Sequence, residues 1–209
     1  RLLRVLRRLD RVLPVDLSPT LLGAHVVPPE HANSRDAYVD LVCREMIPQA
    51  ASEGLAESVD VYCDPGAFSN AESRRVLEAG RDHGLALRIH AEQFADLGSA
   101  GMAADLGAVS ADHLEDVNAD DIRRMADAGT VAVLLPGAAV TLRCPWPPAD
   151  ALRDAGVALA LGTDLNPGTS MTANLPLMMS LGCMQMRMTV EEVWRGVTTV
   201  AARAALRPD

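Results

Sequence analysis

Histidine and aspartate side chains stand at the ends of several short apolar runs of this sequence. His25, His90, His113 and Asp164 each close or directly follow such a run. If the runs are neighbouring parallel strands of a barrel, their carboxyl ends meet at one edge, and three imidazoles and a carboxylate come within reach of one another. These residue types at one edge predict a metal site or an acid/base site.

The apolar runs themselves have the character of β-strands. They are short and continuous rather than alternating with polar residues, which is typical of strands covered on both faces. The predicted strands cover residues 20–24, 59–63, 85–89, 108–111, 130–135 and 157–161.

Helix signals lie between the predicted strands. A helix is predicted over 71–81, Asn118 begins another that Gly129 ends, and Thr189 with Glu192 forms the pattern of a capping box. The regular alternation of strand and helix predicts an α/β fold with a parallel sheet. The sheet is either open and doubly wound or closed as a (β/α)₈ TIM barrel, and the spacing of the elements does not choose between them.

The composition excludes several classes of protein. The 209 residues are 49% hydrophobic, which excludes a disordered chain, and the net charge of −9 argues against nucleic acid as a partner. The absence of an apolar run of 18 residues argues against a membrane span. The four cysteines form no C-x-x-C pair, which argues against a zinc ribbon or a disulfide framework and favours the cytoplasm. We expect one continuous domain with a small-molecule partner.

Two common enzyme motifs are missing from the sequence. A dinucleotide-binding fold needs G-x-G-x-x-G after its first strand, and a serine hydrolase of the α/β type needs G-x-S-x-G; neither occurs. The polar residues at the strand ends therefore remain the candidate site.

Four stretches of the sequence closely resemble the imidazolonepropionase family of the metal-dependent amidohydrolase superfamily. They are 22–25 (LGAH), 89–94 (IHAEQF), 110–115 (SADHLE) and 162–168 (GTDLNPG). The resemblance extends from about residue 4 to residue 206. It implies hydrolysis of the cyclic amide of 4-imidazolone-5-propanoate to N-formimidoyl-L-glutamate in histidine degradation.

The resemblance also implies a fold, a (β/α)₈ barrel of the amidohydrolase type with a flanking β-rich domain. On that template residues 1–209 supply strands 3 to 8 as a partial barrel, and the first two strands and the flanking domain are absent. The family's H-x-H metal pair on strand 1 is absent too. We therefore expect a truncated C-terminal half of a barrel that is inactive alone, and a homodimer for the full-length form.

The family motifs assign chemical roles to histidine, aspartate and glutamine residues at the strand ends. His90 and Asp164 match ligands of one divalent metal, zinc or iron. Asp164 would also take the proton from the attacking water, and His113 would polarise the carbonyl or hold the oxyanion. His25 and Gln93 match substrate-binding positions.

The turn after Asp164 offers further groups for a carboxylate. Its side-chain amide, hydroxyls and free backbone N–H groups suit a substrate or product that carries negative charge. We assign Asn166, Gly168 and Thr169 to substrate binding. Two alternatives stay open: a sibling amidohydrolase, such as a cyclic purine or pyrimidine aminohydrolase, and an inactive remnant.

Overall fold

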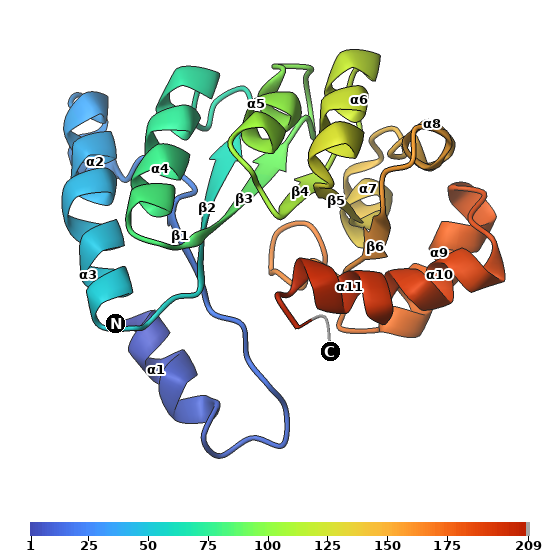
Figure 1. Ribbon diagram of the computed structural model, residues 1–209, viewed down its shortest axis with the longest axis horizontal. Coiled ribbons are helices and arrows are strands. Elements are labelled where there is room, and N and C mark those ends of the chain that lie inside the picture. Colours follow the sequence, from blue (N-terminus) through green and yellow to red (C-terminus); the bar gives the residue numbers. More distant parts are fainter. Residues whose placement is uncertain (208–209) are drawn as a thin grey trace.

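Six parallel strands form the sheet of the computed structural model, which describes residues 1–207 (Figure 1). The strands are β1 (Thr20–Ala24), β2 (Ser58–Cys63), β3 (Ala86–Ala91), β4 (Ser110–His113), β5 (Val131–Leu134) and β6 (Leu159–Leu161). Their order in the sheet follows their order in the chain, and every neighbouring pair is parallel. A doubly wound sheet reverses its strand order at a switch point, whereas a barrel does not. The sheet is therefore part of a barrel, and the open, doubly wound alternative is wrong.

Helices follow the strands in the order expected of βα units. They are α1 (Leu2–Leu9), α2 (Arg35–Leu41), α3 (Ile47–Ser52), α4 (Asn70–Asp82), α5 (Ser99–Asp105), α6 (Ala119–Ala128), α7 (Pro136–Leu142), α8 (Ala149–Asp154), α9 (Leu175–Gln185), α10 (Val190–Gly196) and α11 (Thr199–Ala204), with a 3₁₀ turn η1 (Pro29–His31) and a π-helical turn η2 (Val42–Met46). Helix α4 packs on β2 and β3, α5 on β3 and β4, and α10 on β6. These helices cover the outer face of the curved sheet (Figure 1).

The helix ends confirm the predicted caps. The side chain of Asn118 accepts a hydrogen bond from the Asp121 backbone at the start of α6, and Gly129 ends that helix with a φ of 72°. Thr189 and Glu192 form the reciprocal bonds of a capping box at α10. The local signals thus fix where these helices begin and end.

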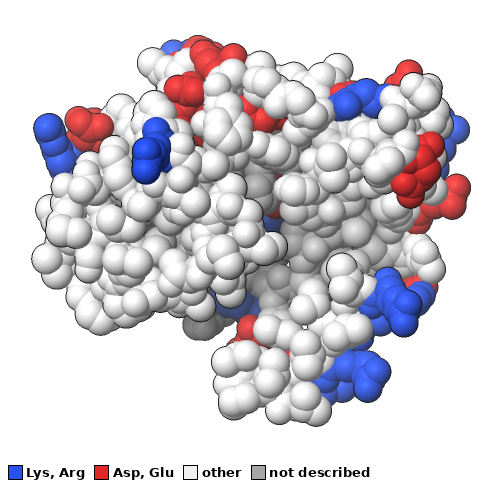
Figure 2. Space-filling view, turned by 180° about the vertical axis from the view of Figure 1, so that it is seen from behind, with Lys and Arg blue, Asp and Glu red and all other residues white. Residues whose placement is uncertain are grey.

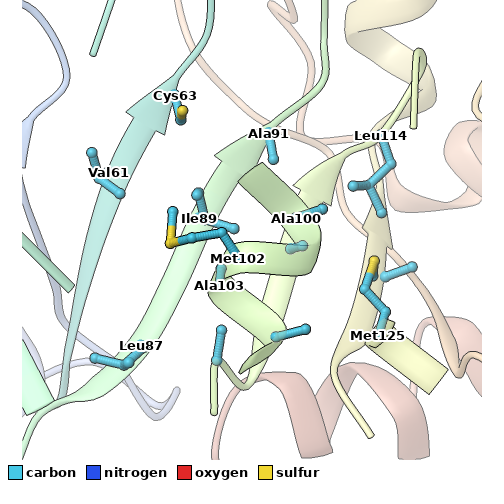
Figure 3. Close-up of a cluster of buried hydrophobic side chains, with 14 of the residues drawn as sticks. Val61, Cys63, Leu87, Ile89, Ala91, Ala100, Met102, Ala103, Leu114 and Met125 are labelled. Carbon is cyan, nitrogen blue, oxygen red and sulfur yellow. The ribbon is translucent and has the colours of Figure 1, made fainter. Parts of the chain in front are cut away.

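The hydrophobic core lies between the outer face of the sheet and the helices. Val61, Ile89 and Ala91 point from β2 and β3 toward Met102 and Ala103 of α5 (Figure 3). The intervening strand residues face the inside of the partial barrel, because side chains alternate along a strand. That inner face is largely polar on β2 to β4. The apolar faces of the helices therefore cover only the outer face of these strands, whereas the sequence predicted strands covered on both faces.

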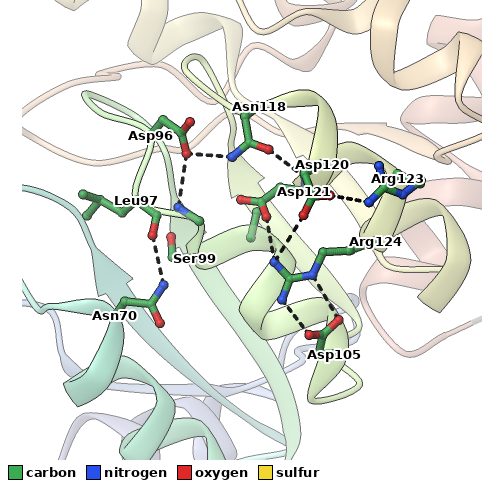
Figure 4. Close-up of polar contacts among 12 residues, drawn as sticks. Asn70, Asp96, Leu97, Ser99, Asp105, Asn118, Asp120, Asp121, Arg123 and Arg124 are labelled. Carbon is green, nitrogen blue, oxygen red and sulfur yellow. Dashed lines mark hydrogen bonds and ion pairs between the residues drawn. The ribbon is translucent and has the colours of Figure 1, made fainter.

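Polar contacts join α5 to α6 above the core. The Arg124 guanidinium donates to Asp105 of α5 at 2.6 Å and to Asp121 of its own helix at 3.0 Å (Figure 4). Gly101 allows this approach, because a Cβ there would lie 2.0 Å from the Asp121 Oδ1 atom. The pairing holds α5 against α6.

Helix α11 lies across the amino ends of the strands. Ala204 packs against Val131 and Ala160 on the inner side of β5 and β6. The guanidinium of Arg203 donates to the carbonyl of Gly129, just before β5, and that of Arg207 donates to Glu57, just before β2, at 2.9 Å. This end of the partial barrel is thereby covered, and the carboxyl ends of the strands stay accessible.

The first helix forms as its amphipathic pattern predicts but buries none of its residues. Arg4 holds it through an ion pair with Glu53 at 2.6 Å. None of the helices within residues 1–207 has the length and apolar character needed to cross a membrane.

Candidate functional site

A cavity of about 610 Å³ opens at the carboxyl ends of the strands. It lies on the inner side of the partial barrel, and the side seen in Figure 2 is hollowed along its middle, with most charged side chains at the periphery. All eight residues predicted for the site line this cavity: His25, His90, Gln93, His113, Asp164, Asn166, Gly168 and Thr169. Tyr62 and Phe94, which sequence reasoning missed, line it as well. The structure brings the predicted residues together, and their individual roles stay predictions.

His90 is oriented by a carboxylate that the sequence analysis did not identify. The Nδ1 atom of His90 lies 3.1 Å from Oδ1 and 3.0 Å from Oδ2 of Asp60, on the neighbouring strand β2. Asp112 stands beside His90 on β4. Burial lowers the pKa of His90, but the Asp60 and Asp112 carboxylates outweigh it and raise that pKa to about 9. The alternation of apolar and acidic residues in Val59-Asp60-Val61 was the available signal that Asp60 faces inward.

Carboxylates close to His90 favour a cation bound to this ring. Ligand atoms of Asp60, His90 and Asp112 all lie within 4.8 Å of one another. The Asp112 Oδ1 atom is buried and has no hydrogen-bond partner among residues 1–207. With Nδ1 held by Asp60, the ring presents Nε2 as the ligand atom, and mixed imidazole and carboxylate ligation suits zinc or iron. The negative potential that favours a proton on His90 equally favours a cation.

Asp164 shares the cavity with His90 but does not belong to that acidic group. Its carboxylate instead accepts a hydrogen bond from the Thr169 hydroxyl at 3.3 Å. Its backbone is left-handed, with a φ of 49°. Non-glycine residues rarely adopt this conformation, and such strain is common where a side chain is held for function.

The turn after Asp164 differs from the prediction in one respect. The Asn166 Oδ1 atom accepts from the backbone N–H of Gly168 at 2.8 Å and of Thr169 at 2.7 Å. The Asn166 amide donates to the Asp164 carbonyl and to the Thr169 hydroxyl. The backbone N–H groups of Gly168 and Thr169 are therefore not free, because the Asn166 side chain uses them to build the turn.

Gln93 is held at the cavity wall from two sides. Its backbone N–H donates to Asp64 at 2.8 Å, and its Oε1 atom accepts from the Tyr62 hydroxyl at 3.1 Å. Burial raises the pKa of Tyr62 to about 12, so the phenol keeps its proton. The His25 ring stacks on Tyr62 with 5.5 Å between ring centroids. With Oε1 engaged by Tyr62, Gln93 keeps its NH₂ group to offer to a ligand.

His113 lies beside His90, with 5.5 Å between the two ring centroids. Its backbone and that of Leu114 are both left-handed, with φ values of 79° and 71°. This turn brings the next acidic residue, Glu115, to within 3.8 Å of the His113 Nδ1 atom. The site thus combines strained backbone with closely spaced titratable groups, as functional sites often do.

Glu92 is not among the cavity residues, although strand alternation alone would put it on the same face as His90. Its backbone is left-handed, with a φ of 49°, and this turns the side chain away. Its side chain is fully buried beneath α5 and accepts hydrogen bonds from the Ser99 and Ala100 backbone. It therefore belongs to the fold and not to the cavity lining.

The sequence is similar to curated proteins named imidazolonepropionase. An imidazolonepropionase of Rhizorhabdus wittichii is 53% identical over 205 residues, which cover 98% of this chain and 51% of the relative. One of Ectopseudomonas mendocina is 50% identical over 210 residues, covering all of this chain and 52% of the relative. The chain spans about half the length of the curated relatives it matches. No family model matches it.

Structural comparison shows the fold. A zinc-bound adenosine deaminase from Xanthomonas campestris superimposes with a TM-score of 0.68 at 19% identity, covering 91% of this chain and 47% of that protein. The chain folds as a partial barrel of the amidohydrolase type, and its resemblance to the imidazolonepropionases is confirmed over nearly all of its length and about half of theirs.

Proposed function

We propose that this chain forms part of an enzyme that hydrolyses the cyclic amide of 4-imidazolone-5-propanoate to N-formimidoyl-L-glutamate. The observation that carries the proposal is the convergence of the eight predicted residues on one cavity at the carboxyl ends of the strands. The curated relatives at about half identity bear the name of this activity. Active sites of (β/α)₈ enzymes lie at this edge of the barrel.

The proposal gives His90 and Asp164 the role of metal ligands, with Asp60 behind His90. When bound, a zinc or iron ion would supply a water whose pKa is lowered toward about 7. Residues 1–209 contain no H-x-H pair, so they do not supply the ion's remaining ligands in that form. We propose that two further strands, with those ligands, and a flanking β-rich domain come from sequence outside residues 1–209.

The side chains of this chain would then guide water and substrate. Asp164, held by the Thr169 hydroxyl, takes a proton from the water as the water oxygen bonds to the ring carbonyl carbon. The same carboxyl passes that proton to the ring nitrogen as the ring C–N bond breaks. His113 donates to the carbonyl oxygen while negative charge develops there.

The remaining cavity residues would hold the substrate. The Gln93 NH₂ group donates to the imidazolone ring, and His25 packs beside it on Tyr62. The turn built by Asn166, with Gly168 and Thr169, borders the propanoate side. We further propose that the protein is cytoplasmic and that its full-length form is a homodimer.

The test is an assay of the longest natural product of this gene with imidazolonepropanoate, with bound metal quantified in the same sample and adenosine as a comparison substrate. We expect conversion to N-formimidoyl-L-glutamate with about one metal per chain and no release of ammonia from adenosine. Bound metal without conversion would contradict the proposed substrate. The absence of both metal and conversion would contradict the proposal that the protein is an enzyme.

A further inference from the structure

Glu115 is a buried carboxylate that no other part of the fold explains. Its side chain has no exposed surface, and neither of its oxygens has a hydrogen-bond partner among residues 1–207. A carboxylate without partners is among the least favourable groups to bury, and buried polar atoms in proteins are nearly always paired. We therefore expect the buried Glu115 carboxylate to serve a function.

The ring of His113 lies within 4 Å of this carboxylate. The Glu115 Oε1 atom lies 3.8 Å from the His113 Nδ1 atom, which is also buried and without a partner in the described chain. A small change in either side chain brings the two atoms within hydrogen-bond distance. The ring of His113 lines the cavity next to His90.

The backbone is shaped to produce this arrangement. His113 and Leu114 are consecutive left-handed residues, with φ values of 79° and 71°, and neither is glycine. An extended chain would send the side chains of residues 113 and 115 along one face of a strand, about two residue spacings apart. The left-handed pair turns the chain, so that Glu115 comes to the Nδ1 edge of His113 instead.

We propose that Glu115 is a positioning residue that accepts the Nδ1–H of His113 and thereby directs Nε2 of that ring at the cavity. The inference rests on the proposed function, in which His113 acts on the carbonyl oxygen. A histidine whose one nitrogen is held by a carboxylate has a fixed tautomer and orientation at the other. The carboxylate also matches the charge of a ring that carries protons on both nitrogens, the form that donates to an oxyanion.

The kinetic test uses Glu115→Gln and Glu115→Met in the longest natural product of the gene, with Asp116→Asn as control. Asp116 is the adjacent acidic residue and is exposed. We expect kcat to fall about 10- to 100-fold in Glu115→Met and less in Glu115→Gln, whose amide oxygen still accepts the Nδ1–H. KM and the metal content should change less than about threefold, as should every parameter of Asp116→Asn. A kcat of Glu115→Met within twofold of the parent would overturn the proposal.

A second readout does not depend on the substrate. In protein labelled with ¹⁵N-histidine and loaded with zinc, we expect the His113 Nδ1 to carry a proton in the parent and to lose it in Glu115→Met, with His113→Gln used to assign the signal. If the proposed substrate proves wrong, this change still supports the positioning role. An unchanged Nδ1 signal in Glu115→Met would contradict that role even if the parent hydrolyses imidazolonepropanoate.

Discussion

Glu92 follows His90 by two residues, just as Glu115 follows His113 by two residues on the next strand. Both carboxylates are buried, yet their surroundings differ. Glu92 accepts hydrogen bonds from the Ser99 backbone at 2.7 Å, the Ser99 hydroxyl at 2.6 Å and the Ala100 backbone at 3.1 Å. Glu115 accepts none within residues 1–207 and lies 3.8 Å from the His113 Nδ1 atom.

The difference separates two uses of a buried charge. The hydrogen-bonded carboxyl group of Glu92 ties the loop after β3 to the start of α5, although burial raises its pKa to about 7. The unpaired carboxylate of Glu115 adds nothing comparable, and a site that keeps such a group gives up stability for function. The Nδ1 atom of His113, a cavity residue, also lacks a partner in the described chain.

The largest expected effect lies at the metal site. We predict that His90→Ala or Asp164→Asn in the natural product lowers kcat/KM by about 10³-fold or more, because the water of lowered pKa is lost with the metal. Bound metal should fall with activity, as quantified by elemental analysis of the same samples. Full metal occupancy in either variant would show that the substituted residue is not a metal ligand. It would also weaken the contrast between the cavity residues and Glu92.

A smaller effect is expected at Glu72, a second carboxylate paired for the fold. Burial raises the pKa of Glu72, but hydrogen bonds from Arg35 and Ser69 outweigh it and lower that pKa to about 2. A lowered pKa adds stability above the unfolded value of about 4.3 and loses it as the pH falls toward 2. Glu72→Gln should therefore cost about 2 kcal/mol at pH 7, and the cost should shrink as the pH approaches 3.

Urea unfolding of the parent and of Glu72→Gln at several pH values measures this cost. Glu78→Gln, at an exposed pair on the same helix, provides the control. A cost for Glu72→Gln that stays constant from pH 7 to pH 3 would show that the ion pair does not supply it.

The smallest effect is expected at Tyr62, which pairs with a cavity residue. Tyr62→Phe removes the hydrogen bond to the Gln93 Oε1 atom and leaves the stacking on His25 in place. One neutral hydrogen bond is worth about 1 kcal/mol, so KM should rise about two- to fivefold with little change in kcat. Steady-state kinetics decide the matter, and a fall in kcat with an unchanged KM would place Tyr62 among the groups that act on the reacting atoms.

Much of the fold could be predicted from local sequence. The first strand has the predicted bounds, the other strands shift by one or two residues, and the Asn118 and Thr189 caps form as expected. The cavity lining also followed from strand-end positions and family motifs. These features depend on residues close together in the chain.

The missed features depend on strand register and on unusual backbone conformations. Asp60 reaches His90 because β2 and β3 pair with Tyr62 opposite His90, a register that no local pattern specifies. Glu115 meets His113 because of two left-handed residues that are not glycine. The spacing of the elements did not choose between an open and a closed sheet, but the family resemblance implied a barrel, and the order of the strands confirms it.

The most direct test of the contrast compares Glu92→Met with Glu115→Met in the natural product, measuring the free energy of unfolding and kcat for each. Glu92→Met leaves three buried donors without an acceptor and should cost about 3 kcal/mol of stability while kcat of the folded protein stays within about threefold. Glu115→Met removes a buried charge whose one proposed partner is His113, and should change stability by less than about 1 kcal/mol while kcat falls. A loss of stability in Glu115→Met as large as that in Glu92→Met, with kcat retained, would contradict the account.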